Sequence, residues 1–599
     1  MAAVAEQTKV LKGGEFLIAD ALVESTFTPE EFNEEQLMVR QMVRDFIDQE
    51  IFPNLDKIEK QEDTIAATLL EKMAELGLLG SHMPEEYGGM EMDTNTNTLI
   101  CDVMGGSSGS FTVSFAAHTG IGMLPILYYG SEAQKQEWLP RLINGELKAA
   151  YCLTEPGSGS DATGAKTTAM LDGDHYVLNG QKMWISNAGF ADVFIVFAQV
   201  DGDKFTGFIV PQGLEGLTLG AEEDKLGIKG SSTRQVFFEN VRVPADNYLG
   251  EIGRGHLIAF NVLNVGRFKL HALSVGGAKR ALGVGIKYAN ERVQFKQPIA
   301  NFGAIKYKIG EGAIRIFAGE SALYRVSQQI QDMNKALQAD GISFDEAKRL
   351  SAEEYAIECA LLKFLGSEML DYVVDEVLQI HGGMGYSEET LAPRMYRDSR
   401  INRIYEGTNE INRLLSVDML MRRAMKGALD IASPAWNVQK ELATPALNEI
   451  PEGEYGQEMK SVADFKKLIL MLVGAAAKGQ MDGKLNLKEE QEILMNVADM
   501  LADLLTAEST LLRVRKLREN NLGTQPQELY DAILRTHFHD VNGRMRKNAL
   551  DAIASFAEGK LLDVFVQGID RFTVYPPQNV KKLRRIVADD LIAKNEYAI

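Results

Sequence analysis

The spacing of apolar residues changes along the chain and predicts a helical region first. Within residues 28–150, Thr28 precedes a pair of acidic residues, a combination that favours the start of a helix. Apolar side chains then recur at helical spacing, at Leu37, Met38, Val43 and Phe46. A second helix is predicted over TIAATLLEKMAELGLLG, with Gly80 as its C-terminal cap. The segment EAQKQEWLPRLINGE predicts two short helices separated near Pro140.

A strand-forming pattern replaces the helical one between about residues 151 and 255. The segment HYVLNGQKMWIS predicts a hairpin, because two β-prone runs flank Asn179 and Gly180, the pair preferred in type I′ turns. Further β-prone runs follow with Gly, Pro and Asp between them: DVFIVFAQV, FTGFIVP and QVFFENVRVP. The helical pattern returns over residues 256–432, so the predicted order is α, then β, then α.

A fourth, helical region is predicted over residues 433–599. It begins with a segment that carries three prolines and weak periodicity, residues 432–458, which predicts a linker. An apolar helical stripe follows, formed by Ile493, Val497, Met500, Leu501, Leu504, Leu505, Leu511 and Leu512. The apolar run at 468–477 is shorter than the roughly 18 residues of a membrane span. It predicts a buried helix, with a segment at a membrane surface as the alternative.

Length and charge narrow the function classes. At about 150 residues per domain, 599 residues predict several domains. The 63 Lys and Arg residues against 84 Asp and Glu give a net charge of −21, and no long basic run is present. Such a surface repels phosphate backbones, which argues against a nucleic-acid-binding protein.

The cysteines and the N-terminus bear on location. The three cysteines show no CxxC spacing, which excludes a zinc knuckle and a thioredoxin motif, and so few cysteines suit a reducing compartment. No basic segment followed by an apolar run opens the chain, so no secretory signal is predicted. We therefore expect a cytoplasmic protein, with an organelle matrix as the alternative.

Common nucleotide and metal motifs are absent from the sequence. It has no GxxxxGK[ST] and no GxGxxG between a strand and a helix, so neither a P-loop nor a Rossmann site is predicted. His537 and His539 are two residues apart, which places them on different faces of a helix. We therefore predict no metal site.

Three segments are chemically unusual. The loop YCLTEPGSGSDATG (151–164) offers free backbone N–H groups and hydroxyls that suit a ring carbonyl or a phosphate, or it is a flexible connector. In QIHGGMGYSEE (379–389), three glycines follow a helix, whereas a helix cap requires one. In RIYEGTNEINR (403–413), Glu406 stands beside apolar and aromatic residues, which would raise its pKa and suit a base. The alternative is an exposed Glu406 ahead of a helix capped by Thr408 or Asn409.

Together these motifs resemble the acyl-CoA dehydrogenase family. Five segments occur in the family's order within about residues 28–430: YCLTEPGSGSD, QKMWIS, NERVQF, QIHGGMGY and RIYEGTNEINR. The helical region beyond residue 440, with FTPEEFNEEQ and KLGIKGSST, is similar to the very-long-chain branch. The resemblance implies an α+β fold with an N-terminal helical domain (28–150), a middle β-barrel or β-sandwich domain (151–255), a helical bundle (256–432) and an extra helical domain (433–599).

The resemblance implies FAD-dependent oxidation of an acyl-CoA thioester to the trans-2-enoyl-CoA. Glu406 matches the family's catalytic base, which removes the α-proton while the β-hydride passes to flavin N5. Hydrogen bonds from the flavin ribityl hydroxyl and from the backbone N–H of Glu406 would stabilise the developing enolate.

The flavin contacts implied by the resemblance are spread along the chain. They are Tyr151, Leu153, Thr154, Gly159, Ser160, Trp184, Ile185, Ser186, Arg292, Phe295, Gln379, Gly382, Gly383, Thr408 and Glu410. Arg292 would bind the FAD pyrophosphate from a neighbouring subunit, which implies an oligomer. Gly303 departs from shorter-chain members, which have a flavin-contacting Gln at this position.

The implied substrate contacts are Ser160, Arg267, Tyr405 and Gly407. A helical arginine such as Arg267 more often lies on a solvated face, which is the alternative interpretation. The segment SFTVSFAAHTGIG matches the helix at the bottom of the acyl pocket. Shorter-chain members carry Gln and Glu where this chain has Val113 and Ala117, so we expect a deeper pocket and a long-chain substrate. Phe111 and Phe115 could refill that space.

The implied partners follow from the same resemblance. Electrons would pass to electron-transferring flavoprotein. An acyl-CoA oxidase that uses O2 is one alternative, and an assembly role for a long-chain relative is another. The C-terminal extension occupies the region where tetrameric relatives pair their dimers, so we expect a homodimer, with a tetramer as the alternative.

Overall fold

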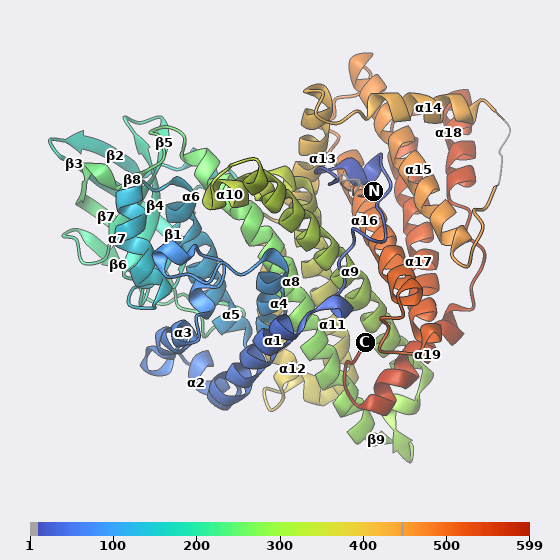
Figure 1. Ribbon diagram of the computed structural model, residues 1–599, viewed down its shortest axis with the longest axis horizontal. Helices are drawn as coiled ribbons and strands as arrows, with labels where there is room; N and C mark the ends of the chain where they lie inside the picture. Colours follow the sequence, from blue (N-terminus) through green and yellow to red (C-terminus); the bar gives the residue numbers. More distant parts are fainter. Residues whose placement is uncertain (1–9, 445–448) are drawn as a thin grey trace, which may run out of the picture.

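The helices and strands follow the predicted order, α, then β, then α. The structure, a computed structural model, describes residues 10–444 and 449–599. Figure 1 shows the β-sheet at the left, the long helices of the central bundle next to it, and the C-terminal helices at the right. The predicted α+β architecture with an extra C-terminal helical domain is confirmed.

The first helical region consists of short helices. They are α1 (Glu34–Phe46), α2 (Leu55–Glu59), α3 (Ile65–Glu75), α4 (Thr94–Gly105), α5 (Gly109–Ala116), α6 (Leu124–Tyr129) and α7 (Glu132–Ile143). The helix predicted from Thr28 starts later, because Thr28 caps a single 3-10 turn and Asn33 caps α1 by accepting a hydrogen bond from Gln36 N. α3 ends before Gly77, whose φ of 73° stops the helix ahead of the predicted Gly80.

The strands follow this helical region. They are β1 (Ala149–Cys152), β2 (Thr168–Asp172), β3 (His175–Ser186), β4 (Val193–Val200), β5 (Lys204–Pro211), β6 (Leu217–Leu219), β7 (Thr233–Pro244) and β8 (Tyr248–Leu249). They form one sheet in the order β6-β7-β3-β2-β4-β5-β8, and β1 pairs in parallel with β4. The interior of this domain is formed by β4, whose residues are nearly all buried.

Two local predictions are wrong. Asn179 and Gly180 lie inside β3, and the hairpin turn between β2 and β3 falls at Gly173 and Asp174 instead. A Cβ on Gly180 would lie 2.5 Å from Oγ1 of Thr167, so the glycine permits a close approach at a bulge rather than a turn. Pro140 lies within the last turn of the continuous helix α7, where the loss of one hydrogen bond is tolerated.

The second helical region is a bundle of long helices. It contains α8 (Gly255–Glu291), the hairpin strands β9 (Val293–Gln294) and β10 (Gln297–Pro298), α9 (Gly303–Ala339), α10 (Phe344–Glu354), α11 (Ala356–His381), α12 (Leu391–Arg400) and α13 (Asn409–Met425). α8 and α11 run side by side, since Gly277 faces Leu370 and Gly285 faces Val377. Helix α8 also contacts α4, so it joins the two helical regions.

The C-terminal extension is helical as predicted. It contains α14 (Ala432–Leu442), α15 (Gly456–Met481), α16 (Gln491–Glu519), α17 (Gln527–Ala554), α18 (Gly559–Phe572) and α19 (Val580–Lys594). The segment predicted as a linker is partly helical, since it contains α14, which buries Val438 in the core of the helical regions. Residues 445–448 of that segment lie outside the described residues. The apolar run at 468–477 lies in α15 with Leu468, Ile469 and Leu472 buried, which confirms a core helix.

The segment Gly109–Tyr129 is long and apolar enough to cross a membrane by length and composition. In the structure it forms α5, the π-helical segment Ala117–Gly122 and α6, and 89 % of its most apolar window is buried within the protein. Its hydropathy is therefore explained by its position in the core.

A chain of buried ion pairs connects the extension to the rest of the molecule. Arg513 on α16 contacts Glu320 on α9 (2.8 Å) and Glu30 near the N-terminus (2.7 Å). Glu320 also pairs with Lys279 on α8, and Lys279 pairs with Asp102 on α4 (2.7 Å). Arg513, Glu320 and Asp102 are all nearly inaccessible to solvent. Each charge is therefore stabilised only while its partners from other helices are in place.

We expect Arg513→Met to destabilise the protein by about 3–5 kcal/mol, because it leaves Glu30 without this partner and Glu320 with Lys279 alone. The matched control is Arg515→Met, which removes an exposed pair with Glu519 and should change stability by less than about 1 kcal/mol. Urea denaturation followed by tryptophan fluorescence measures both changes. Equal losses in the two variants would contradict the role given to the buried pairs.

Candidate active site

Glu406 lies in a short loop that the surrounding helices hold by its backbone. The residue has a φ of 59°, a left-handed conformation that is unusual for a residue with a side chain. The backbone carbonyl of Glu406 accepts hydrogen bonds from Nε of Arg267 and from Nδ2 of Asn412, both at 3.3 Å. Nζ of Lys363 donates to the carbonyl of Gly407 at 2.7 Å. These bonds offset the strain and fix the direction of the Glu406 side chain.

The carboxylate of Glu406 is desolvated. Its Oε2 atom is buried and has no hydrogen-bond partner among the described residues. Burial raises the pKa of Glu406 to about 7, while the positive charges of Arg267 and Lys363 oppose the shift. A Cβ on Gly266 would lie 2.6 Å from Oε2, so this glycine of α8 leaves the space that the carboxylate occupies. The predicted setting for a base is therefore present, and the exposed alternative is excluded.

Glu406 faces a cavity of about 180 Å³ that runs along α8. The helix contributes Gly266, Lys269, Leu270, Leu273, Gly277 and Arg280. The opposite wall consists of small side chains from α4, α5 and the π-helical segment: Gly105, Gly106, Gly109, Val113, Ala116, Ala117 and Gly120. From Gly266 to Arg280 the helix rises about 21 Å, at 1.5 Å per residue, so the cavity is long and narrow.

Of the predicted substrate contacts, Tyr405 lines this cavity, whereas Ser160, Arg267 and Gly407 are not among its lining residues. Val113 and Ala117 of the predicted acyl-pocket helix and Ser186 of the predicted flavin site line it as well. Phe111 is fully buried in the N-terminal core and, like Phe115, does not refill the cavity as the alternative proposed. The small side chains of Val113 and Ala117 therefore remain at the cavity wall.

Arg267 and Tyr151 also lie close to Glu406. Arg267 is 5 % exposed, which excludes the solvated alternative, and Nη1 donates to Oδ1 of Asn264 at 2.9 Å. Tyr151 is buried without a hydrogen-bond partner for its hydroxyl among the described residues, and burial together with the Glu406 charge raises its pKa. Gly407 has a φ of 80°, and Thr408 caps α13 by accepting from Ile411 N. The exposed Glu410 lies in the first turn of α13.

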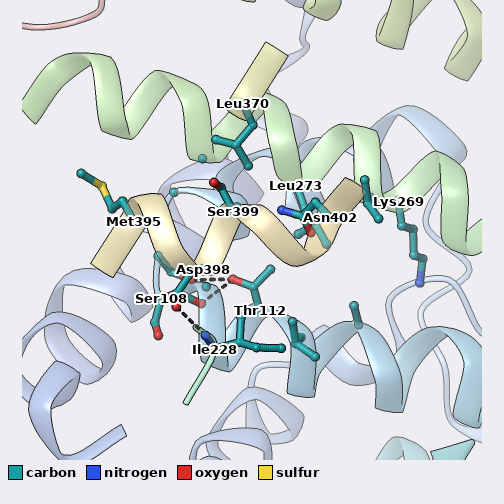
Figure 2. A pocket seen from close by; sticks show the side chains of 18 of the residues that line it. Ser108, Thr112, Ile228, Lys269, Leu273, Leu370, Met395, Asp398, Ser399 and Asn402 are labelled. Carbon is teal, nitrogen blue, oxygen red and sulfur yellow. Dashed lines mark hydrogen bonds between the residues drawn. The ribbon is translucent and has the colours of Figure 1, made fainter. Parts of the chain in front are cut away.

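Asp398 on α12 is a cavity residue that sequence reasoning missed. Its Oδ1 accepts a hydrogen bond from the backbone N–H of Ile228 at 2.5 Å, and burial raises the pKa of Asp398 to about 7. Figure 2 shows Asp398 between α12 and the segment carrying Ser108 and Thr112. Its signal in the sequence was a single acid within RMYRDSRINR, among four arginines. It joins three separate segments at the cavity wall.

The loop residues predicted to contact flavin form a second group beside β3. Met183 N donates to the carbonyl of Thr154 at 2.9 Å, which joins the loop to the strand. Leu153 and Ile185 are buried beneath, whereas Gly159 and Ser160 are exposed. Trp184 is 51 % exposed with a φ of 60°, so an indole face is held at the surface. Apart from their own chain neighbours, no described residue has an atom within 4 Å of a Cβ placed on Gly157 or Gly159. An exposed aromatic face beside open glycine backbone fits a planar, hydrogen-bonding ring such as isoalloxazine.

The remaining predicted flavin residues lie at the far ends of α8 and α11. Arg292 and Phe295 follow α8, and Phe295 is 88 % exposed. The ring of Tyr288 stacks on His381 at 4.1 Å, which joins this end of α8 to the glycines that follow α11. The exposed Gln379, Gly382 and Gly383 therefore lie beside them. Arg292 is 26 residues beyond Gly266, about 39 Å along α8, so this group does not meet Glu406 within one chain.

Taken together, these groups place a desolvated carboxylate at a cavity and, beside β3, an exposed surface suited to a planar cofactor. The chain belongs to the acyl-CoA dehydrogenase family. Family models match its N-terminal domain at residues 33–146, its middle domain at 150–241, and C-terminal domains at 253–421 and 464–571. The family is FAD-dependent, and the predicted cofactor and enzyme class are confirmed.

Individual relatives support this assignment over the whole chain. A probable acyl-CoA dehydrogenase of Bacillus subtilis (strain 168) is 44% identical over 594 residues, 98% of this chain and 99% of the relative. A crystal structure of an acyl-CoA dehydrogenase complexed with FAD from Bacillus anthracis has a TM-score of 0.95 and 42% identity, covering 98% of this chain and 100% of that one. The human mitochondrial very long-chain specific acyl-CoA dehydrogenase is 36% identical over 410 residues, 66% of this chain and 59% of the relative.

Glu406→Gln should change how stability depends on pH. The folded pKa of Glu406, about 7, lies above its ordinary value of 4.5, so wild-type stability falls as pH rises through this window. We expect the stability of the variant relative to wild type to be about 2–3 kcal/mol greater at pH 8 than at pH 5. Urea denaturation at the two pH values measures this difference.

The matched control for that measurement is Glu75→Gln, at an exposed position on α3. Its stability relative to wild type should be the same at both pH values. If Glu406→Gln behaves like this control, the Glu406 carboxylate is solvated and the proposed setting is wrong.

Proposed function

We propose that Glu406 is the base with which this acyl-CoA dehydrogenase removes the α-proton of a long-chain acyl-CoA thioester. The observation that carries the proposal is the buried Oε2 atom of Glu406, which faces an apolar cavity and has no competing hydrogen-bond partner among the described residues. A pKa of about 7 leaves much of the carboxylate unprotonated at neutral pH and still basic enough to accept a proton.

The Glu406 loop also supplies a donor for the thioester carbonyl. The backbone N–H of Glu406 donates to no described residue, while its own carbonyl is held by Arg267 and Asn412. The carboxylate and the backbone N–H both belong to Glu406, whose left-handed backbone fixes their relative directions. The base and the group that donates to the thioester carbonyl are therefore positioned together. When bound, FAD supplies the acceptor for the β-hydrogen. Tyr405 and Gly407 border the reacting thioester, and Ser160 would contact the CoA moiety.

The flavin contacts divide between two subunits in this proposal. The loop Tyr151–Ser160 and Trp184–Ser186 would hold the ring from the chain that carries Glu406, with Thr408 and Glu410 nearby. Arg292, Phe295, Gln379, Gly382 and Gly383 would hold the adenosine half from a neighbouring chain, since the α8 helix separates them from Glu406 within one chain. A homodimer therefore completes each site. At Gly303, where shorter-chain members have a Gln, a Cβ would lie 2.8 Å from Nη2 of Arg585. Helix α19 of the extension thus lies against the start of α9.

The cavity favours a long acyl chain. The wall opposite α8 carries small side chains, at Val113, Ala117 and Gly120. The part of α8 that lines the cavity is about 21 Å long. Electron-transferring flavoprotein is the proposed electron acceptor, because the Bacillus subtilis and human relatives described above are named dehydrogenases. A cytoplasmic location stays a prediction.

Anaerobic addition of palmitoyl-CoA to the purified yellow enzyme should bleach the flavin absorbance. In Glu406→Gln the bleaching should slow by at least about 1,000-fold, since an amide accepts no proton. The control Glu75→Gln should bleach at the wild-type rate.

Bleaching in Glu406→Gln at the rate of the control would remove Glu406 as the base. Admitting air after bleaching tests the electron acceptor. Rapid reoxidation with stoichiometric hydrogen peroxide would favour the oxidase alternative over electron-transferring flavoprotein.

Ala117→Leu should shift the chain-length preference. The larger side chain fills part of the cavity, so kcat/KM for palmitoyl-CoA should fall about tenfold or more relative to butyryl-CoA. Thr163→Leu, at an exposed position outside the cavity, should leave the ratio unchanged. A wild-type preference for butyryl-CoA would refute the long-chain proposal directly.

A further inference from the structure

A second cavity, of about 90 Å³, adjoins the Glu406 cavity and contains three basic side chains. Its apolar lining includes Tyr128, Val265, Phe268, Ala272 and Ile330. His82, Lys269 and Lys348 line it as well. Lys269 lines both cavities, and Figure 2 shows it extending from α8 on the side away from Asp398. This side chain therefore forms a shared wall between the two spaces.

The two lysines have no anionic partner among the described residues. Nζ of Lys269 donates to the carbonyl of Thr119 at 3.4 Å, and Nζ of Lys348 donates to the carbonyl of His82 at 2.6 Å. Neither ammonium group forms an ion pair with a described carboxylate. The buried Lys182, by contrast, pairs with Glu155 at 2.7 Å.

The third basic group is also incompletely satisfied. His82 is 9 % exposed, and its Nε2 atom has no hydrogen-bond partner among the described residues. Burial lowers the pKa of Lys348 to about 7, and the neighbouring Lys269 lowers it further, while Glu91 and Asp93 oppose the shift. The pKa of His82 is lowered by burial and by both lysines. Three donor groups thus surround a space whose walls are partly apolar, and an anion that entered it would favour the protonated form of each group.

We propose that this cavity, which we call the basic cavity, binds a carboxylate carried on an apolar chain. Lys269 and Lys348 would hold the carboxylate by charge-assisted hydrogen bonds, with His82 as a further donor, and the apolar walls would cover the chain.

Two molecules present this chemistry. One is a free fatty acid, which needs no catalytic step. The other is an acyl-CoA whose acyl chain ends in a carboxylate. Its thioester would lie in the Glu406 cavity, and its chain would pass Lys269 into the basic cavity. This second source rests on the proposed function.

The first test is calorimetric titration of octanoate into the purified holoenzyme. Binding should weaken about tenfold or more in Lys269→Met and in Lys348→Met, because each removes one charge-assisted bond while keeping an apolar side chain of similar length. Lys335→Met, at an exposed position on α9, should bind octanoate as wild type does. Thermal melting of each variant shows whether it is folded.

The second test uses Glu406→Gln, which should hold substrates without turnover. An acyl-CoA with a terminal carboxylate is compared with its methyl-terminated counterpart of equal length, across several lengths. The carboxylate form should bind about tenfold more tightly, and this preference should disappear when Lys348→Met is added. That result assigns the site to the far end of the substrate. Octanoate binding without this preference assigns it to a free acid.

The proposal is overturned if octanoate does not bind and no terminal carboxylate is preferred, or if all three lysine variants bind equally well. Failure of the proposed function gives a different result. It appears in the wild-type enzyme as absence of flavin bleaching with every acyl-CoA, and it leaves the octanoate titration unaffected.

Discussion

The molecule depends on charges that are buried between helices distant in sequence. Arg513 of the extension, Glu320 of α9 and Lys279 of α8 form one continuous chain of ion pairs that ends on Asp102 of α4. Buried ion pairs of this kind add little net stability over apolar packing, but a missing partner is costly. The network therefore specifies a single docking of the extension rather than strengthening the fold in general. Because α8 is a member, the helix that lines the Glu406 cavity is positioned by the same constraint.

The catalytic loop is tied to the extension by a second set of charges. Helix α13 begins directly after this loop, and its Arg413 pairs with Glu368 of α11 and with Asp499 of α16, both at 2.7 Å. The loop is thus fixed at one side by α8 and α11 and at the other by a helix that the extension holds. The extension consequently contacts the helix that begins at the end of the Glu406 loop.

The sequence predicted the parts of this protein that depend on short-range patterns. The order of the regions and the motif around Glu406 could be read from periodicity and from family resemblance. The turn predicted at Asn179 and Gly180 is wrong, because these residues lie inside β3, where Gly180 packs closely against Thr167 in a contact that the local sequence does not reveal. Lys269 and Asp398 escaped notice for a similar reason. A charged residue on an amphipathic helix is usually solvated, and only the packed structure shows that these two line a cavity.

The placement of the positive charges around Glu406 decides how strong a base it is. Arg267 and Lys363 donate to backbone carbonyls of the loop and not to the carboxylate. A direct ion pair would lower the pKa of Glu406 towards or below its ordinary value and leave a weak base. Burial lowers the pKa of Lys363 itself to about 7, so the lasting charge is that of Arg267. By binding the backbone carbonyls of Glu406 and Gly407, these side chains limit the pKa rise caused by burial and leave the carboxylate oxygens free for the substrate.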